Sequence, residues 1–205
     1  MEKEKYLNDL REIKDIMNRS SRFLSLSGLS GISAGILALI GAFAAYQIVY
    51  TDQDYQSYGK VTITPESLTN LLIIAVVTLV LSVGTVIYFT TRETRKRNQK
   101  IWDYQTRRLL INLAIPLITG GILCLILLFR GYIGLVAPLT LIFYGLALVN
   151  ASKYTLDEIR SLGLAEIGLG LVAAHFIGFG LLFWSIGFGL LHIAYGISMH
   201  LKYRS

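Results

Sequence analysis

The sequence predicts an all-α, multi-pass membrane protein of six transmembrane helices arranged as three hairpins. Of the 205 residues, 54% are hydrophobic and only 16% are charged, and the mean hydropathy is +0.57, whereas soluble domains carry about 25% charged residues. Five long stretches contain almost no charged residue. Uncharged apolar runs of about 18 residues or more indicate membrane spans, because hydrocarbon cannot solvate a charged side chain. The basic residues gather at alternate ends of these stretches.

These stretches divide into six predicted helices, each near the roughly 20 residues that cross a hydrocarbon core of about 30 Å. The last of these stretches, in which Glu166 is the one charged residue, would make a single helix of about 60 Å, twice the thickness of the core. We therefore place a tight turn in it near Gly178 and Gly180, since glycine tolerates positive φ. A five-span chain with one re-entrant segment is the alternative. The predicted helices are Leu26–Tyr50, Leu68–Phe89, Leu109–Phe129, Ile133–Val149, Leu162–Phe179 and Leu181–Leu201.

The chain begins with a charged segment in which apolar side chains recur at helical spacing, with opposite charges four residues apart. This pattern predicts an amphipathic cytoplasmic helix over residues 1–23, followed by a transmembrane domain over residues 24–205. Its six basic and five acidic residues nearly balance, so attraction to anionic lipid is weak. Contact with protein is the favoured use, and a simple lead-in to the first span is the alternative.

The basic residues predict the orientation. Seventeen of the 19 Lys and Arg residues lie at the two termini and in the loops after the second and fourth helices, against only Lys60 and Arg130 on the other side. Cytoplasmic segments carry such an excess. We therefore expect both termini in the cytoplasm, with a basic loop over residues 92–108 on the same side. The net charge of +6 then needs no nucleic-acid partner.

The largest connection on the far side, Thr51–Ser67, is too short for a catalytic domain. We expect a solvated connector there, with a binding loop as the alternative. Pro65, followed by Glu66 and Ser67, predicts the start of the second helix.

Glycine is abundant, with 19 residues concentrated in the spans. Helices in lipid gain little by burying apolar surface, so close backbone approach supplies much of their attraction. Any of these faces could also meet a second copy of the chain, which leaves a homo-oligomer open. The glycines expected at helix contacts are Gly31, Gly35, Gly121, Gly170, Gly178, Gly189 and Gly196.

Two ionisable residues are predicted to meet within the membrane. Glu166 lies about 13 residues before the turn near residue 179 and His192 about 12 residues after it, so antiparallel helices place both at equal depth, roughly 18–20 Å from the turn. Tyr195 lies one turn nearer the cytoplasm as a candidate accessory group. His175, the other candidate, lies closer to the turn and does not join the pair.

Three interpretations of this pair are open. The first is an interhelical hydrogen bond or ion pair that fixes the helix register. The second is a proton-responsive site, and the third is part of a route for protons or small cations. We expect no metal and no cofactor, because no further ligands lie at this depth. The sequence also contains no catalytic motif of the common hydrolase, zinc or phosphate-binding types, so we expect no enzymatic activity.

The glycine-punctuated helix pairs, ending in the stretch Gly187–Gly196 (GFGLLHIAYG), resemble small six-helix bacterial proteins of the HdeD-like type over roughly residues 24–201. The cationic loop and the charged N-terminal helix depart from that family. The resemblance implies a location in the inner (cytoplasmic) membrane and a link with acid stress.

We therefore expect a non-enzymatic accessory or stress-associated protein. It would act through oligomerisation and through contacts of a cytoplasmic protein with residues 92–108 and the N-terminal helix, within a lipid bilayer. The alternative is a small channel or secondary transporter for protons or small cations that uses Glu166 and His192.

Overall fold

All regular structure in the described part of the chain is helical. The computed structural model describes residues 28–50, 65–96, 102–156 and 158–202. The predicted amphipathic helix over residues 1–23 and residues 51–64 of the far-side connection lie outside this part. The helices are α2 (Gly28–Tyr50), α3 (Pro65–Lys96), α4 (Tyr104–Phe129), α5 (Val136–Ala151), α6 (Glu158–His175), α7 (Gly180–Trp184), the π-helical segment η3 (Ser185–Leu191) and α8 (His192–Lys202).

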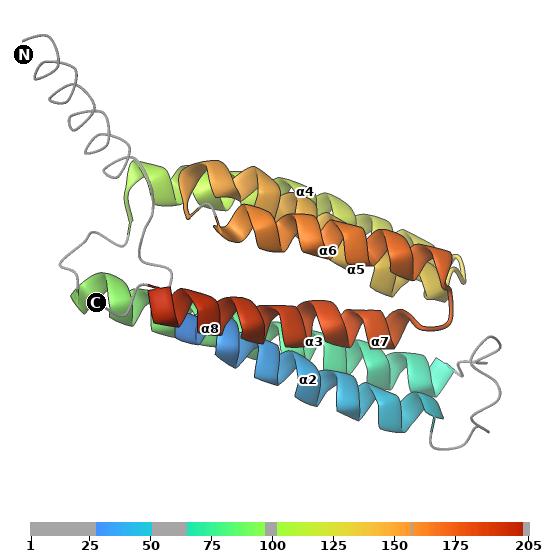
Figure 1. Cartoon of the computed structure of the whole chain (residues 1–205). Helices are drawn as coiled ribbons and strands as arrows, with labels where there is room; N and C mark the ends of the chain where they lie inside the picture. Colours follow the sequence, from blue (N-terminus) through green and yellow to red (C-terminus); the bar gives the residue numbers. More distant parts are fainter. Residues whose placement is uncertain (1–27, 51–64, 97–101, 157, 203–205) are drawn as a thin grey trace, which may run out of the picture.

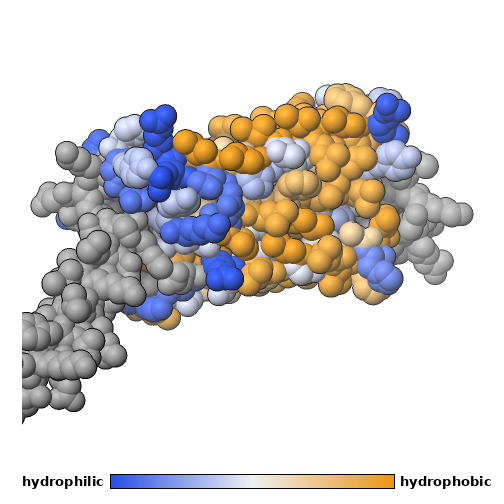
Figure 2. Space-filling model, turned by 90° about the horizontal axis from the view of Figure 1, so that it is seen from above, coloured by the Kyte–Doolittle hydropathy of each residue, from blue (hydrophilic) through white to orange (hydrophobic). Residues whose placement is uncertain are grey.

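In the described part of the chain, five helical segments are long and apolar enough to cross a membrane, as expected for a multi-pass membrane protein. Figure 2 shows a broad hydrophobic zone over the middle of the molecule, with hydrophilic residues toward both ends. The last span is continuous through α7, η3 and α8. The five segments are Gly28–Ile48, Pro65–Lys96, Tyr104–Phe129, Ile133–Tyr154 and Gly180–Lys202.

The predicted fifth helix is displaced. It was expected over Leu162–Phe179, but α6 spans Glu158–His175 and has only 18 residues. Its first turn carries Glu158 and Arg160, which suit a helix end at the membrane surface, and three charged residues in so short a helix separate it from the five apolar spans. The helix ends before Gly178, whose φ of 116° makes the predicted turn.

Much of the predicted basic loop over residues 92–108 is helical instead. α3 continues to Lys96, and α4 begins at Tyr104, where the Asp103 side chain accepts a hydrogen bond of 2.7 Å from the Thr106 amide. Such a cap satisfies a free amide at the helix start. Residues 97–101 lie outside the described chain. The predicted start of the second helix at Pro65 is confirmed.

The described basic residues lie almost entirely at one end of the molecule, where α2 begins and α8 ends (Figure 1). Arg130, after α4, is the exception among the nine described Lys and Arg residues. The other eight are Arg92, Arg95, Lys96, Arg107, Arg108, Lys153, Arg160 and Lys202.

The helices pack as two groups of three and not as three hairpins. α5 lies between α4 and α6 in one group, and α2 lies between α3 and the α7–η3–α8 span in the other (Figure 1). The first two predicted hairpins, α2–α3 and α4–α5, are packed units. The third is wrong as a packing unit, because α6 packs chiefly on α5 and α8 packs chiefly on α2. The turn at residues 176–179 therefore joins one group to the other.

Glycines bring α2 and α8 into backbone contact. A Cβ atom added to Gly196 would lie 2.6 Å from the Gly28 carbonyl oxygen, and one added to Gly31 would lie 3.2 Å from the Cα of Gly196. Gly35 faces the Gly189 carbonyl oxygen in the same way, at 2.7 Å, and Gly189 in turn lies against the Leu39 side chain. These four predicted packing glycines thus lie at one seam, and Gly28 is an additional member.

The other group has a similar seam between α5 and α6. A Cβ atom at Gly170 would lie 2.7 Å from Ile142 Cγ1, and Gly145 and Gly163 face each other's carbonyl oxygens. Gly121 does not take its expected packing role, since a Cβ atom added there would meet no other helix within 4 Å among the described residues. Its neighbour Gly120 does so instead, against the ring of Phe143. Gly178 serves the turn.

We predict that Gly196→Ala destabilises the protein by roughly 1–3 kcal/mol, the usual cost of overpacking a close contact. The added methyl group would meet backbone atoms of Gly28 and Ile32, both 2.6 Å away, which cannot rotate aside. Gly121→Ala is the matched control, because the same methyl group would meet nothing there. Thermal unfolding in detergent measures both, and equal midpoints for the two variants would refute the seam.

Candidate functional site

Glu166 and His192 meet between the two helix groups. Glu166 Oε1 lies 3.4 Å from His192 Nδ1, and the residues are 0% and 6% exposed. Glu166 is the ninth residue of the 18-residue α6, about 12 Å from the helix start. The two side chains that the sequence places at equal depth are therefore in contact, deep in the bundle.

His192 has two further polar partners. Tyr144, on α5, places its hydroxyl oxygen 2.7 Å from His192 Nε2, and the Gly187 carbonyl oxygen lies 3.0 Å from Nδ1. When Nδ1–H donates to Gly187, Nε2 is the acceptor and the Tyr144 hydroxyl donates to it. Both imidazole nitrogens are thus satisfied, and the orientation of the ring is fixed.

The Glu166 carboxyl group is less well satisfied. Neither oxygen has a hydrogen-bond partner among the described residues. His192 Nδ1 lies closer to the Gly187 carbonyl oxygen, at 3.0 Å, than to Glu166 Oε1, at 3.4 Å. A buried carboxylate without donors is costly. The group can avoid that cost in two ways. It can carry a proton, or it can remain a carboxylate that is paired with a protonated His192.

Gly187 makes room for the carboxyl group. A Cβ atom at this position would lie 2.5 Å from Glu166 Oε2 and 2.5 Å from Leu141 Cδ2. The residue lies in η3, the widened π-helical segment of the last span directly before His192. Such π-helical segments occur frequently at functional sites.

The cluster of Glu166, His192 and Tyr144 lies at the middle of three junctions between the helix groups. Toward the turn, α7 packs on α5, with Gly180 against Ala137 and Pro138. At the basic end, Lys202 of α8 donates a hydrogen bond to Glu158 of α6 on the surface. Most other contacts between the groups in the described chain come from α7 and η3.

The remaining predicted site residues lie apart from the hydrogen bonds of the cluster. Tyr195 packs with Tyr144 against the apolar residues Leu148, Ile159 and Leu162. His175 is exposed near the turn, with its ring 4.8 Å from that of Phe176. Within the described residues, no group of three His, Cys, Asp or Glu side chains could hold a metal ion.

Sequence reasoning missed Tyr144 and the π-helical segment. A tyrosine hydroxyl in the middle of a span needs a polar partner, and that signal was available in the fourth span. The glycines at 187 and 189 also weaken an α-helix, but they fit close helix packing equally well. Only the fold brings α5 beside the last span.

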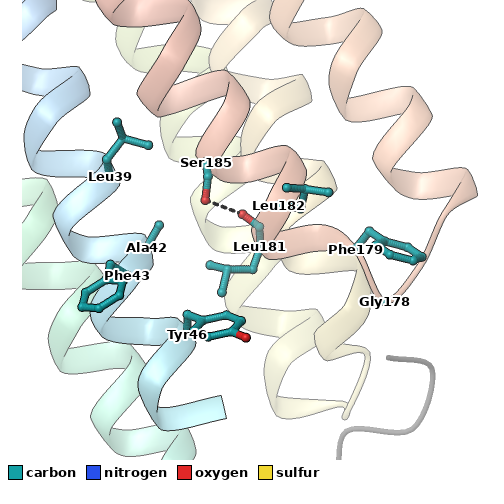
Figure 3. Close-up of a pocket in the computed structure, with 9 residues that line it drawn as sticks. All are labelled: Leu39, Ala42, Phe43, Tyr46, Gly178, Phe179, Leu181, Leu182 and Ser185. Atoms are coloured by element: carbon teal, nitrogen blue, oxygen red, sulfur yellow. Dashed lines mark hydrogen bonds between the residues drawn. The ribbon is translucent and has the colours of Figure 1, made fainter. Parts of the chain in front are cut away.

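A separate cavity of about 360 Å³ lies between α2 and α7. Figure 3 shows that its lining is nearly all hydrocarbon, and that the Ser185 hydroxyl is turned away to donate a 2.7 Å hydrogen bond to the Leu181 carbonyl. None of the cluster residues lines it. The cavity therefore offers no chemistry to the cluster. Its lining residues are Leu39, Ala42, Phe43, Tyr46, Gly178, Phe179, Leu181, Leu182 and Ser185.

No family model, curated protein or solved structure matches the chain. The HdeD-like resemblance therefore stays a prediction. The findings support an all-helical protein with five helices able to span a membrane.

We predict that Tyr144→Phe destabilises the protein by roughly 1–3 kcal/mol, because it leaves a buried nitrogen of His192 without its partner. The change removes only one oxygen atom and leaves the ring contacts with Phe188 and His192 in place. Tyr132→Phe, on a residue that is 60% exposed, is the control. Thermal unfolding in detergent would contradict the hydrogen bond if both variants matched the parent protein.

Proposed function

We propose that the protein is a non-enzymatic accessory protein of the inner membrane, with both termini in the cytoplasm, that acts through contacts at its basic end. The observation that carries the proposal is the distribution of charge. Eight of the nine described basic residues lie at one end of the helices, and basic residues concentrate on the cytoplasmic side. The ends of α3 and α4 supply five of the eight.

The exposed basic residues at this end support a contact with a cytoplasmic protein. Arg107 and Arg108 are exposed at the start of α4, with the Arg108 guanidinium 4.4 Å from the ring centre of the exposed Tyr104. Arg and Tyr side chains are common anchors at protein interfaces. The association with stress and the formation of oligomers belong to the same proposal, from the resemblance and from the glycine-rich faces.

The burial of Glu166 and His192 supports a structural use of the pair. An open transport route would bring water to the ionisable groups, and here the carboxyl group is 0% exposed. In hydrocarbon, such a contact holds helices at a fixed depth.

A small carrier of protons or cations is the second candidate. The π-helical segment beside His192 favours it, since such segments occur frequently at functional sites. In that case the buried pair would represent a closed state of the route.

Labelling of single cysteines tests the orientation. In a Cys124→Ser background, we expect Tyr132→Cys to react with a membrane-impermeant maleimide on intact cells, because it lies at the end with few basic residues. Lys153→Cys should react only after permeabilisation. Both positions are exposed, so access depends on the side of the membrane, and the reverse pattern would overturn the proposed orientation.

Flux into proteoliposomes separates the two candidates. The accessory function predicts proton, sodium and potassium fluxes equal to those of protein-free vesicles. A flux that Glu166→Gln abolishes and Glu158→Gln preserves would overturn the accessory function in favour of the carrier. Glu158 is the matched control because it lies on the same helix but at its surface end, paired with Lys202.

A further inference from the structure

The polar cluster combines three features that a purely structural contact does not need. Its carboxyl group has no hydrogen-bond donor among the described residues, its imidazole has a partner on each nitrogen, and the side chains come from both helix groups. Glu166 and Tyr144 belong to one group and His192 to the other. Any change in the charge of the cluster therefore acts at the junction between the groups.

Counting protons shows which states the cluster can adopt at low cost. With a protonated Glu166 and a neutral His192, it carries no net charge. In the tautomer whose Nε2–H donates to the Tyr144 oxygen, Nδ1 lies 3.4 Å from Glu166 Oε1, and moving the carboxyl proton to Nδ1 breaks an O–H bond and forms an N–H bond. The result is a carboxylate beside an imidazolium, with Nε2–H donating to the Tyr144 oxygen. Both states hold the same number of protons, and both are neutral overall.

Gaining or losing a proton leaves a net charge. One more proton adds an imidazolium beside a carboxylic acid, and one fewer leaves a carboxylate beside a neutral imidazole. An isolated charge costs several kcal/mol or more in a low-dielectric interior. Water entry lowers that cost, and because Glu166 is 0% exposed between the two helix groups, separation of the groups would admit water.

We propose that Glu166, His192 and Tyr144 form a binding site for one proton at the junction of the helix groups, and that the junction is closed only while this proton is bound. The site holds the proton between the carboxyl group and the imidazole. Tyr144 is a positioning residue, since its hydroxyl can donate to Nε2 or accept from it. The inference concerns the junction itself and does not depend on the accessory function.

The surrounding elements bring few other ionisable groups to the site. Tyr195 of α8 packs against the same apolar residues as Tyr144. By sequence, α7 and η3 carry no ionisable side chain. α2 carries only tyrosines near its far end, and Cys124 of α4 is directed at the Val136 carbonyl oxygen. Glu166 and His192 therefore dominate the charge of the site.

The test is the pH dependence of thermal unfolding in lipid nanodiscs, for the full chain and four single variants. Glu166→Gln and His192→Gln remove one ionisable group each. Glu158→Gln and His175→Gln are controls of the same chemistry outside the cluster. We expect the parent and both controls to be most stable at an intermediate pH and to lose roughly 2–4 °C or more on either side, a shift typical of about 1 kcal/mol.

The two cluster variants should each lose one side of this profile. Glu166→Gln cannot form a carboxylate, so it should lose the alkaline decline and keep the acid one. His192→Gln cannot form an imidazolium, so it should lose the acid decline and keep the alkaline one. Profiles parallel to that of the parent protein, merely shifted downward, would overturn the proton site and leave a structural contact.

A second measurement uses the intact cluster, in case the variants do not fold. In a His175→Gln and His200→Gln background, His192 is the only histidine, and its ring nitrogens can be followed by ¹⁵N NMR. We expect the two ring nitrogens to keep the same chemical shifts over the pH range of highest stability, and to change protonation only where stability declines. A ring that titrates freely while stability stays constant would overturn the proposal.

Discussion

Hydrocarbon as a solvent is the constraint on which this structure depends. In water, apolar helices associate because burial removes their surface from water, but in lipid that gain is absent. The helices must then be held by close backbone contact and by polar groups. Both devices are present, and in different places. Glycine seams hold α8 to α2 and α6 to α5 within each group, whereas the buried contact of Glu166, His192 and Tyr144 lies between the groups.

The contacts within each helix group therefore differ in kind from the contacts between the two groups. Inside a group, a Cβ atom added to a glycine at the helix contact would lie too close to a carbonyl oxygen of the neighbouring helix. The two helices therefore have little freedom to slide along each other. Between the groups, α7 and η3 make most of the contacts, and the polar cluster depends on the protonation of two side chains. The close contacts within a group are thus made by glycines, which do not ionise, and the buried contact between the groups contains Glu166 and His192, which do.

Much of this arrangement could be predicted from the sequence, because the lengths of the apolar runs and the positions of the charged residues indicate how deep each residue lies in the membrane. The lengths of the apolar runs predicted the six helices, and the antiparallel count from the turn predicted that Glu166 and His192 meet. The positive φ of Gly178 agrees with the turn expected in the long uncharged stretch. Gly31 and Gly35 were expected at a helix contact, because in lipid the small residues mark the faces that approach closely.

The rest depended on which helix packs on which, and spacing along the chain does not contain that information. Helices that are neighbours in the sequence were expected to pair. On this basis, α6 was paired with the last span, whereas in the structure α6 packs chiefly on α5. That error hid Tyr144, which reaches His192 only because α5 lies beside η3. Gly121 was expected at a helix contact, but a helix turns by about 100° per residue, and it is the neighbouring Gly120 that faces Phe143.

The central claim is that Glu166 and His192 interact directly and so join the helix groups. A double-mutant cycle tests it most directly, with Glu166→Gln, His192→Gln and the double variant compared by unfolding in one detergent at neutral pH. The account predicts a coupling free energy of about 1 kcal/mol or more, because removing either partner leaves the other buried and poorly satisfied. Additive effects of the two substitutions, with a coupling indistinguishable from zero, would contradict it.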